Sequence, residues 1–296
     1  MKPLVIALPG NEDFAGRLAD RLGAEQGTMA ARHFPDGETY VRLACNVSER
    51  DVILVSTLDR PDDKTLRLLF TAEAVRDLGA AKVGLVAPYL AYMRQDRRFL
   101  PGEAITSKTY ARVLSGSFDW MVTVDPHLHR RSSMSEIYTI PVAVCHAAPS
   151  ITEWIGTNVT NPIVIGPDVE SEQWVSAVAG AAGAPFTVLE KHRSGDRDVD
   201  ITVRDIGQWR DRIPVLVDDI ISSGRTMEVA TKQLIVHGLA APVIVGVHGI
   251  FADDAFERLQ AAGARQIVST NAIPHISNAI DLSELVQRSI SNLVRP

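Results

Sequence analysis

Cysteine is scarce in this chain, and long apolar runs and a basic excess are missing. Cys45 and Cys145 are the only cysteines among the 296 residues. Their spacing fits no metal-ligand pattern, which argues against a zinc or disulfide framework. Their apolar, strand-like neighbourhoods instead predict reduced thiols in the protein core. No apolar run reaches the length of a membrane span, because charged residues or histidines interrupt each one.

The charge balance also limits the partners. A formal net charge of −6 argues against nucleic acid as the main partner. Anionic substrates would then need local groups of basic residues, and such groups occur. Hydrophobic residues make up 46% of the chain, which is ample for globular cores. Met1-Lys2-Pro3 leads directly into a predicted strand without a visible signal peptide. We therefore expect a soluble, cytoplasmic protein that binds neither nucleic acid nor membrane.

Apolar β-branched runs alternate with amphipathic stretches, which is typical of α/β proteins with a mainly parallel sheet. Strands are predicted at 4–8, 28–32, 52–56, 82–87, 120–124, 163–165, 187–189, 214–217, 243–247 and 266–269. Helices are predicted at 12–22, 64–78, 105–114, 171–182, 227–237, 255–262 and 282–293. The pattern restarts near Pro141 and Pro149, which predicts two domains, 1–145 and 146–296. The restart raises the hypothesis of a fused duplication, and the last helix is expected to pack on the first half.

The most informative stretch reads VLVDDIISSGRT and ends at Thr226. Its apolar start predicts a strand that is buried on both faces and ends at Val217. Asp218 and Asp219 follow at the carboxyl end, where open α/β sheets bind ligands. A turn of small and hydroxyl residues then leads into a helix, and free backbone N–H groups in such a turn suit a phosphate. The residues of this turn are Ser222, Ser223, Gly224, Arg225 and Thr226.

The two carboxylates cannot hold that phosphate, because like charges repel, and they suit the hydroxyl groups of a sugar beside it. Acids at this place also occur as helix caps or metal ligands, and Ser-Gly before a helix is common turn chemistry. The whole string resembles the phosphoribosyl diphosphate (PRPP) motif shared by type I phosphoribosyltransferases and PRPP synthetases. It therefore indicates a site for a sugar phosphate.

Two segments in the first half are candidate nucleotide contacts. The turn FPDGET contains Phe34, Asp36 and Glu38, and it is either ordinary hairpin chemistry or a place where a base and a ribose bind. The run PYLAYMRQDRRF follows a predicted strand and carries three arginines between Arg94 and Arg98. Planar guanidinium groups there could clamp phosphates, and a solvated loop is the alternative.

A metal site and a lid are suggested by two other segments. VDPHLH ends a predicted strand, and His127 or His129 is either a metal ligand or an ordinary loop histidine. Asp168 ends a strand in the second half and could share magnesium with His127, since magnesium keeps substrate phosphates and waters among its ligands. EKHRSGD contains Lys191 and Arg193. It is by default a solvated hairpin loop, and as a lid it would bring two cations onto a phosphoryl group.

Taken together, these segments resemble the PRPP synthetase (ribose-phosphate diphosphokinase) family across almost the whole chain. FPDGE, PYLAYMRQDRRF, VDPHLH, Pro167-Asp168, KHR and VDDIISSGRT occur in the family's order and approximate spacing. The resemblance implies two type I phosphoribosyltransferase-like domains and a homo-oligomer, at least a dimer. It also implies Mg²⁺ as cofactor, ATP and ribose 5-phosphate as substrates, and PRPP and AMP as products.

The resemblance also assigns roles by position. Lys191 and Arg193 would be the catalytic cations of a mobile loop, and His127 and Asp168 would hold magnesium. Six residues would contact ATP, namely Phe34, Asp36, Glu38, Arg94, Gln95 and Asp96. Asp218 and Asp219 would bind the ribose hydroxyls, and Ser222 through Thr226 the 5-phosphate.

Two rival functions remain open. A type I phosphoribosyltransferase would use the same sugar-phosphate site and accept a nucleobase instead of consuming ATP. A catalytically silent regulatory protein of PRPP-synthetase type would keep the fold and lose the cations of the loop, although Lys191 and Arg193 are both present here. No strong general base is obvious, and a loose phosphoryl-transfer transition state needs little help from one.

Overall fold

The computed structural model describes residues 2–128, 130–168, 171–193, 199–202 and 206–293. They form two compact units, which we call unit 1 (Met1–Cys145 with Ser283–Pro296) and unit 2 (His146–Leu282). This division differs from the predicted one for residues 283–296, which fold with unit 1. None of the helices in the described part of the chain has both the length and the apolar character needed to cross a membrane.

Unit 1 is built on a six-stranded parallel sheet of order β2-β1-β5-β6-β7-β8. Its strands are β1 (Leu4–Ala7), β2 (Glu25–Gly27), β5 (Asp51–Val55), β6 (Lys82–Ala87), β7 (Trp120–Val124) and β8 (Val142–Cys145). The central strands β5, β6 and β7 are buried along nearly their whole length. Helices cover both faces of this sheet, which explains why these strands read as continuous apolar runs instead of alternating ones.

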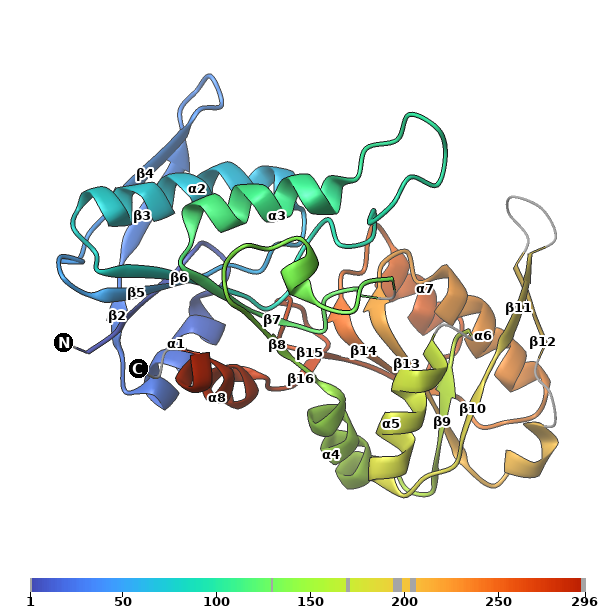
Figure 1. Cartoon of the computed structure of the whole chain (residues 1–296). Coiled ribbons are helices and arrows are strands. Elements are labelled where there is room, and N and C mark those ends of the chain that lie inside the picture. The colour runs from blue at the N-terminus through green and yellow to red at the C-terminus, as the bar shows by residue number, and fades with distance from the viewer. Residues whose placement is uncertain (1, 129, 169–170, 194–198, 203–205, 294–296) are drawn as a thin grey trace. The chain divides into compact units, whose positions relative to one another are not determined.

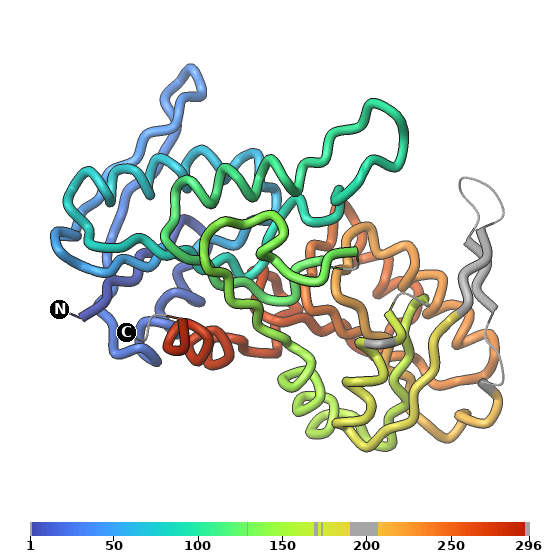
Figure 2. Tube along the Cα trace, in the orientation of Figure 1, coloured from blue at the N-terminus to red at the C-terminus, as the bar shows by residue number. Residues whose placement is uncertain are grey.

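Four helices flank the sheet of unit 1: α1 (Glu12–Leu22), α2 (Pro61–Asp77), α3 (Thr106–Ser117) and α8 (Ser283–Leu293). Figure 1 shows α2 and α3 on one face and α1 and α8 on the other. The blue N-terminal and red C-terminal segments therefore meet in Figure 2. Arg21 joins them, because its guanidinium donates to Ser283 Oγ at 2.9 Å and to Glu284 Oε2 at 3.2 Å. The expected return of the last helix to the first half is confirmed.

Unit 2 repeats this construction with a parallel sheet of order β10-β9-β13-β14-β15-β16. Its strands are β9 (Pro162–Gly166), β10 (Phe186–Val188), β13 (Ile213–Ile221), β14 (Val243–Gly249), β15 (Gln266–Thr270) and β16 (Asn278–Ile280). Helices α4 (Ala148–Asn158) and α5 (Glu172–Ala182) cover one face. Helices α6 (Arg225–Val236) and α7 (Ala255–Ala261) cover the other (Figure 1).

The two sheets have the same topology. Numbered along the chain, the six strands of each unit take the order 2-1-3-4-5-6. Each unit also carries an antiparallel hairpin between its second and third sheet strands. These hairpins are β3 (Met29–His33) with β4 (Thr39–Leu43), and β11 (Glu190–Arg193) with β12 (Val199–Thr202). This repetition, hairpin included, supports the hypothesis of a fused duplication.

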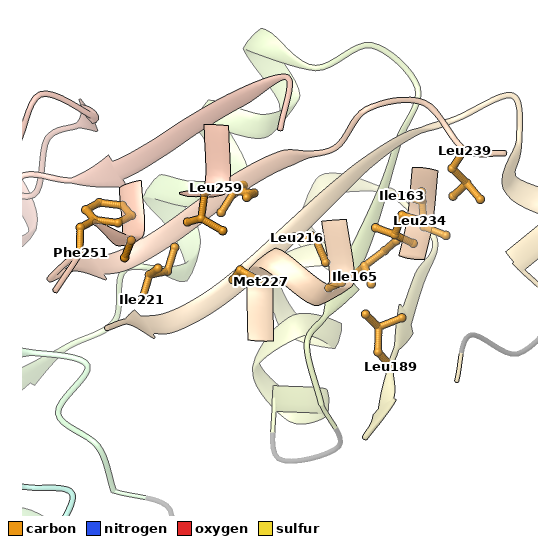
Figure 3. Close-up of a cluster of buried hydrophobic side chains, with 13 residues drawn as sticks. Ile163, Ile165, Leu189, Leu216, Ile221, Met227, Leu234, Leu239, Phe251 and Leu259 are labelled. Carbon is orange, nitrogen blue, oxygen red and sulfur yellow. The ribbon is translucent and has the colours of Figure 1, made fainter. Parts of the chain in front are cut away.

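One apolar core of unit 2 lies directly behind the stretch that the sequence singled out. Figure 3 shows Ile163, Ile165 and Leu216 from β9 and β13 packed against Met227 and Leu234 of α6. Ile221, Phe251 and Leu259 continue the same cluster towards α7 (Figure 3). Burial of an aliphatic side chain of this size contributes about 1.5–3 kcal/mol relative to exposure. The cluster therefore holds the end of β13 and the start of α6 in fixed positions.

Several elements differ from the prediction. Strand β13 runs to Ile221 and not to Val217, because Ile220 and Ile221 continue its pairing with His248 and Gly249 of β14. Helix α4 was not predicted, since Pro149 was interpreted as a domain boundary. This proline lies in the first turn of α4, where its missing N–H costs no helical hydrogen bond. The short edge strands β2 and β16, of 3 residues each, are too brief to give a periodic signal.

Candidate active site

The carboxyl end of β13 presents the two acids of the PRPP-like motif. Asp218 and Asp219 lie inside the strand and not beyond it, because β13 continues to Ile221. The backbone N–H of Asp219 donates to Asp218 Oδ1 at 3.0 Å, which fixes the first carboxyl against the strand. Both residues are half-buried at this end of the sheet. The strand therefore holds two adjacent carboxyl groups in a rigid frame.

The electrostatics of this edge are unfavourable for a charged carboxylate. The pKa of Asp218 is raised well above its ordinary value, first by burial, and then by the charges of Asp219 and, to a smaller degree, Asp168. Asp168 follows β9, the strand that pairs with β13. Three acids from neighbouring strand ends thus influence one another, and a cation or a donor-rich ligand would relieve their repulsion.

Residues Ser222–Thr226, which we call the phosphate turn, join β13 to α6. Gly224 has φ of +67°, a left-handed conformation that favours glycine. Helix α6 begins at Arg225, and the Glu228 N–H donates to Gly224 O at 2.8 Å. The backbone N–H groups of the first turn of α6, which come before Glu228, point out of the N-terminal end of the helix. A helix N-terminus of this kind attracts an anion, as the sequence predicted.

Asp168 is held by a small turn after β9. Its Oδ1 accepts the backbone N–H of Ser171 at 3.2 Å, and its carbonyl accepts Ser171 Oγ at 2.6 Å. A Cβ at Gly166 would lie 2.3 Å from Ser171 Oγ, so a larger residue there would displace the hydroxyl that donates to the Asp168 carbonyl. In the described part of the chain, no three His, Cys, Asp or Glu side chains are grouped closely enough to hold a metal by themselves. Asp168 offers hard oxygen ligands, which fits magnesium completed by substrate phosphates and waters.

The two predicted catalytic cations lie on β11. The segment was interpreted as a loop, but Glu190–Arg193 forms a strand, with Lys191 opposite Ile201 and Arg193 opposite Val199. The reason is the partner strand β12, whose Val-Asp-Ile-Thr sequence has the β-branched residues typical of strands. Ser194, Gly195 and Asp196, which were predicted to form a mobile segment, lie outside the described part of the chain.

The predicted adenine contact lies at the tip of the β3–β4 hairpin in unit 1. Phe34, Asp36 and Glu38 are all exposed there, so the interpretation of FPDGE as a hairpin turn is confirmed. Phe34 N–H donates to Glu38 O at 2.8 Å, and Glu38 N–H donates to Asp36 Oδ1 at 3.2 Å. The Arg32 guanidinium lies 4.6 Å from the Phe34 ring centroid, which steadies the aromatic ring in an open position.

The arginine-rich run after β6 is tied to the rest of unit 1 by its polar members. Arg94 is exposed, whereas the side chain of Asp96 is 4% exposed and pairs with Arg130 Nη1 at 3.4 Å. Arg131 donates to the Asp96 carbonyl at 3.1 Å. Gln95 Oε1 accepts Thr106 Oγ1 at 3.2 Å. The segment is therefore braced by α3 and by two arginines that sequence reasoning did not single out.

Arg130 and Arg131 hold this region together through their contacts with Asp96. The prediction assigned roles only to the histidines before them. The adjacency of the two arginines, directly after VDPHLH, was the available signal. His127 follows β7 and is partly buried. Asp125, which lies between the end of β7 and His127, has a φ of +35°. The backbone N–H of Asp125 donates to Cys145 O at 2.9 Å, which anchors the turn to β8. His129 lies outside the described residues.

Family comparisons agree with this arrangement. The model of the N-terminal domain of ribose phosphate pyrophosphokinase matches residues 4–117. The model of the phosphoribosyl transferase domain matches residues 133–283. A solved structure of phosphoribosylpyrophosphate synthetase from Mycobacterium smegmatis superposes with a TM-score of 0.84 over 98% of each chain, at 24% identity. At this identity the superposition shows the fold alone, with its two phosphoribosyltransferase-like domains.

Sequence relatives carry the family assignment. The ribose-phosphate pyrophosphokinase of Sulfolobus acidocaldarius is 34% identical over 282 residues, covering 93% of this chain and 95% of the relative. That of Sulfurisphaera tokodaii is 32% identical over 265 residues, covering 87% and 89%. That of Methanopyrus kandleri is 31% identical over 293 residues, covering 98% and 99%. With such coverage, and with both domain models in sequence order, the chain belongs to the ribose-phosphate pyrophosphokinase family.

Proposed function

We propose that this protein is a ribose-phosphate diphosphokinase that transfers the diphosphoryl group of ATP to ribose 5-phosphate. The anomeric hydroxyl of the sugar attacks the β-phosphorus of ATP, the bond to the α-phosphate breaks, and PRPP and AMP are released. The observation that carries the proposal is the pair of acids on β13 followed by the phosphate turn, within a family match along nearly the whole chain.

The acceptor would bind at the carboxyl edge of the sheet in unit 2. Asp218 and Asp219 would bind the ribose hydroxyls, which is supported by their position in β13, where the strand fixes their backbone. The 5-phosphate would lie against Ser222, Ser223, Gly224, Arg225 and Thr226, where α6 begins. A phosphate at a helix N-terminus gains hydrogen bonds from backbone N–H groups and a favourable helix dipole. The ribose hydroxyls and the 5-phosphate would thus bind at separate, adjacent places.

The donor would bind to residues of unit 1. The exposed Phe34 ring would stack on adenine, with Asp36 and Glu38 beside it at the hairpin tip. Arg94, Gln95 and Asp96 would contact the rest of ATP. Of these, Arg94 has the exposed cation that a phosphate requires. The Asp96 carboxylate pairs with Arg130. Asp96 would therefore contact ATP and also position that arginine.

Magnesium is part of the same proposal, with His127 and Asp168 as its protein ligands. The oxygen ligands of Asp168 fit a hard divalent cation, and the acids around it form an electronegative edge. When bound, the ion would neutralise charge on the phosphates of ATP. Lys191 and Arg193 would stabilise charge on the transferred group, since cations that meet the substrate only in the transition state mainly raise turnover.

A product analysis tests the reaction. The protein is incubated with ATP, ribose 5-phosphate and Mg²⁺, and the nucleotides and sugar phosphates are separated and quantified. We expect AMP and PRPP in equal amounts, and neither without a divalent cation. Formation of ADP would mean transfer of a single phosphoryl group and would contradict the proposal.

A second function is tested by the same incubation. The match of residues 133–283 to the phosphoribosyl transferase domain favours a nucleobase phosphoribosyltransferase as the rival. That enzyme would leave ATP intact and would consume PRPP together with a base.

Assembly into a homo-oligomer and a cytoplasmic location complete the proposal.

A further inference from the structure

Arg258 of α7 reaches back to the phosphate turn without belonging to it. Its Nη2 donates to the carbonyl oxygen of Ser223, and its Nη1 donates to Asp254 Oδ1 one helical turn earlier. Its Nε lies 3.4 Å from Glu228 Oε2, in the first turn of α6. One guanidinium group therefore connects α7, α6 and the turn between β13 and α6. Two of its nitrogens donate hydrogen bonds, whereas Nε forms an ion pair with Glu228 without a hydrogen bond. A planar guanidinium can reach partners on several sides, whereas a lysine ammonium is a single point charge.

The carbonyl groups of residues 221–224 each accept a hydrogen bond. Ile221 O accepts the backbone N–H groups of Ile250 and Phe251, both at 3.0 Å. Ser222 O accepts the N–H of Ala252 at 3.0 Å, and Gly224 O accepts that of Glu228 at 2.8 Å. Backbone donors thus hold the peptides before and after Ser223. The Ser223 carbonyl is held by a side chain, that of Arg258.

This contact fixes the direction of the next amide. A peptide unit is planar and trans, so its N–H points opposite to its C=O. With the Ser223 carbonyl directed at Arg258, the N–H of Gly224 points away from α7. Gly224 can rotate more freely than any other residue type, and its φ is +67°. The Ser223–Gly224 peptide is therefore the part of the turn that most needs an anchor.

Packing behind the glycine places α7 close enough to provide that anchor. A Cβ at Gly224 would lie 3.4 Å from Ala255 Cβ and from Leu259 Cδ1. Ala255 and Leu259 are fully buried in the core shown in Figure 3. The charge of Arg258 is balanced by Glu228 and Asp254. Its effect on a ligand is thus more geometric than electrostatic.

We propose that Arg258 is a positioning residue for the acceptor site, which holds the Ser223–Gly224 peptide so that the Gly224 N–H faces the 5-phosphate. The proposal rests on the assignment of the phosphate turn to ribose 5-phosphate made above. Arg258 itself does not touch the sugar phosphate. A hydrogen bond to a charged acceptor corresponds to roughly 10- to 100-fold in affinity, which sets the expected size of the effect.

Steady-state kinetics of the full chain, with ATP and ribose 5-phosphate varied separately, test this role. Arg258→Met keeps the aliphatic stem and removes every donor. We expect the KM for ribose 5-phosphate to rise about tenfold or more, with the KM for ATP changed less than about twofold. Arg258→Lys keeps a positive charge beside Glu228 and Asp254 and should still raise the KM for ribose 5-phosphate at least about fivefold, because a single ammonium cannot reproduce the planar fork that donates to both Ser223 O and Asp254.

Arg288→Met is the matched control. Arg288 also pairs with an acid one turn earlier in its helix, Glu284 of α8, but its side chain is 72% exposed and far in sequence from the turn. It should leave both KM values unchanged. If Arg258→Lys folds with a normal melting temperature and binds ribose 5-phosphate normally, the positioning role is wrong. A matching rise in both KM values for either Arg258 variant would also overturn it.

Asp219→Asn, measured in parallel, distinguishes a wrong assignment of the acceptor site from a wrong role for Arg258. If Asp219→Asn weakens ribose 5-phosphate and the Arg258 variants do not, the acceptor site stands and the positioning role of Arg258 is rejected. If neither Asp219→Asn nor the Arg258 variants affect ribose 5-phosphate, the assignment of the phosphate turn is rejected, and the inference with it. A rise in both cases supports both assignments.

Discussion

Asp218 costs folding free energy at neutral pH, which follows from its place inside β13. Burial, with the neighbouring charges of Asp219 and Asp168, raises its pKa well above the ordinary value. In the unfolded chain the group loses its proton near its ordinary pKa, whereas in the folded chain it keeps the proton longer. Its contribution to stability is therefore fully present below the unfolded pKa and falls as pH rises towards the folded pKa. If Asp218 binds the sugar as proposed, the binding group is kept at the expense of stability.

Asp218→Asn should accordingly stabilise the protein and impair it as an enzyme. Asparagine is neutral at every pH, so the melting temperature should rise above that of the unmodified protein, and more at pH 8 than at pH 5. Use of ribose 5-phosphate should weaken, because contacts to hydroxyls are lost. Differential scanning fluorimetry at both pH values measures the first effect and kinetics the second. Asp211→Asn, at an exposed position of unit 2, is the control. A melting temperature lowered equally at both pH values would contradict the argument.

The Cys145 thiol provides an alkaline test of unit 1. Burial raises its pKa to about 11, partly offset by its hydrogen bond to Ser289 Oγ at 3.1 Å. Because the folded pKa exceeds the unfolded one, its stabilising contribution is complete below about pH 9 and is lost as pH rises to about 11. Cys145→Ala should lack this part of the alkaline loss, which amounts to roughly 3 kcal/mol at most.

Urea unfolding at pH 8 and pH 10.5 measures that difference. The buried tyrosines, such as Tyr138 with its raised pKa, lower stability at high pH in both proteins and cancel in the comparison. Parallel loss of stability in the wild type and in Cys145→Ala would show that the thiol does not contribute.

At the scale of an element, the β11–β12 hairpin contains the proposed catalytic cations, Lys191 and Arg193. Lys191→Ala and Arg193→Ala should each lower turnover by roughly 10²–10³-fold, by analogy with removal of one oxyanion-hole donor. Michaelis constants should shift only modestly, because such groups act mainly in the transition state. Steady-state kinetics with both substrates varied provide the measurement. Near-normal turnover with a large rise in the KM for ATP would instead make the hairpin a binding clamp.

The same hairpin illustrates how much the sequence could predict. Buried strands such as β6 and β7 were predicted to the residue, because parallel strands give unbroken apolar runs. Strand β11 was interpreted as a loop, since Glu-Lys-His-Arg has no apolar pattern and owes its conformation to pairing with β12. Arg258 could not be found from the sequence, because its contact with Ser223 spans 35 residues and depends on how α7 packs.

At the scale of the whole molecule, an assembly is expected. The tip of the β3–β4 hairpin exposes Phe34, whose side chain is a large aromatic with 39% of its surface accessible. The family resemblance implies that a neighbouring subunit uses such a ring at its ATP site. Light scattering coupled to size exclusion should therefore give at least a dimer. An active protein with the mass of a single 32.2 kDa chain would contradict the expectation.

The C-terminal helix should be necessary for unit 1. Val286 and Ile290 of α8 are almost fully buried, against α1, β7 and β8. Ile290→Ala should lower the free energy of unfolding by about 2–5 kcal/mol. Hydrogen exchange should accelerate in β7 and β8 and remain unchanged in β13 and β14. Arg288→Ala on the exposed side of the same helix should have little effect. Acceleration spread equally over both units would contradict this assignment of α8.

The return of α8 to unit 1 also determines when each half of the molecule can be completed during synthesis. Domains usually fold in the order in which they leave the ribosome, the N-terminal one first. Here the first half emerges early but lacks α8, which follows unit 2 in the chain, whereas unit 2 ends at Leu282. The half that is translated first is therefore finished last. A chain that stopped after unit 2 would leave uncovered the apolar face against which Val286 and Ile290 pack.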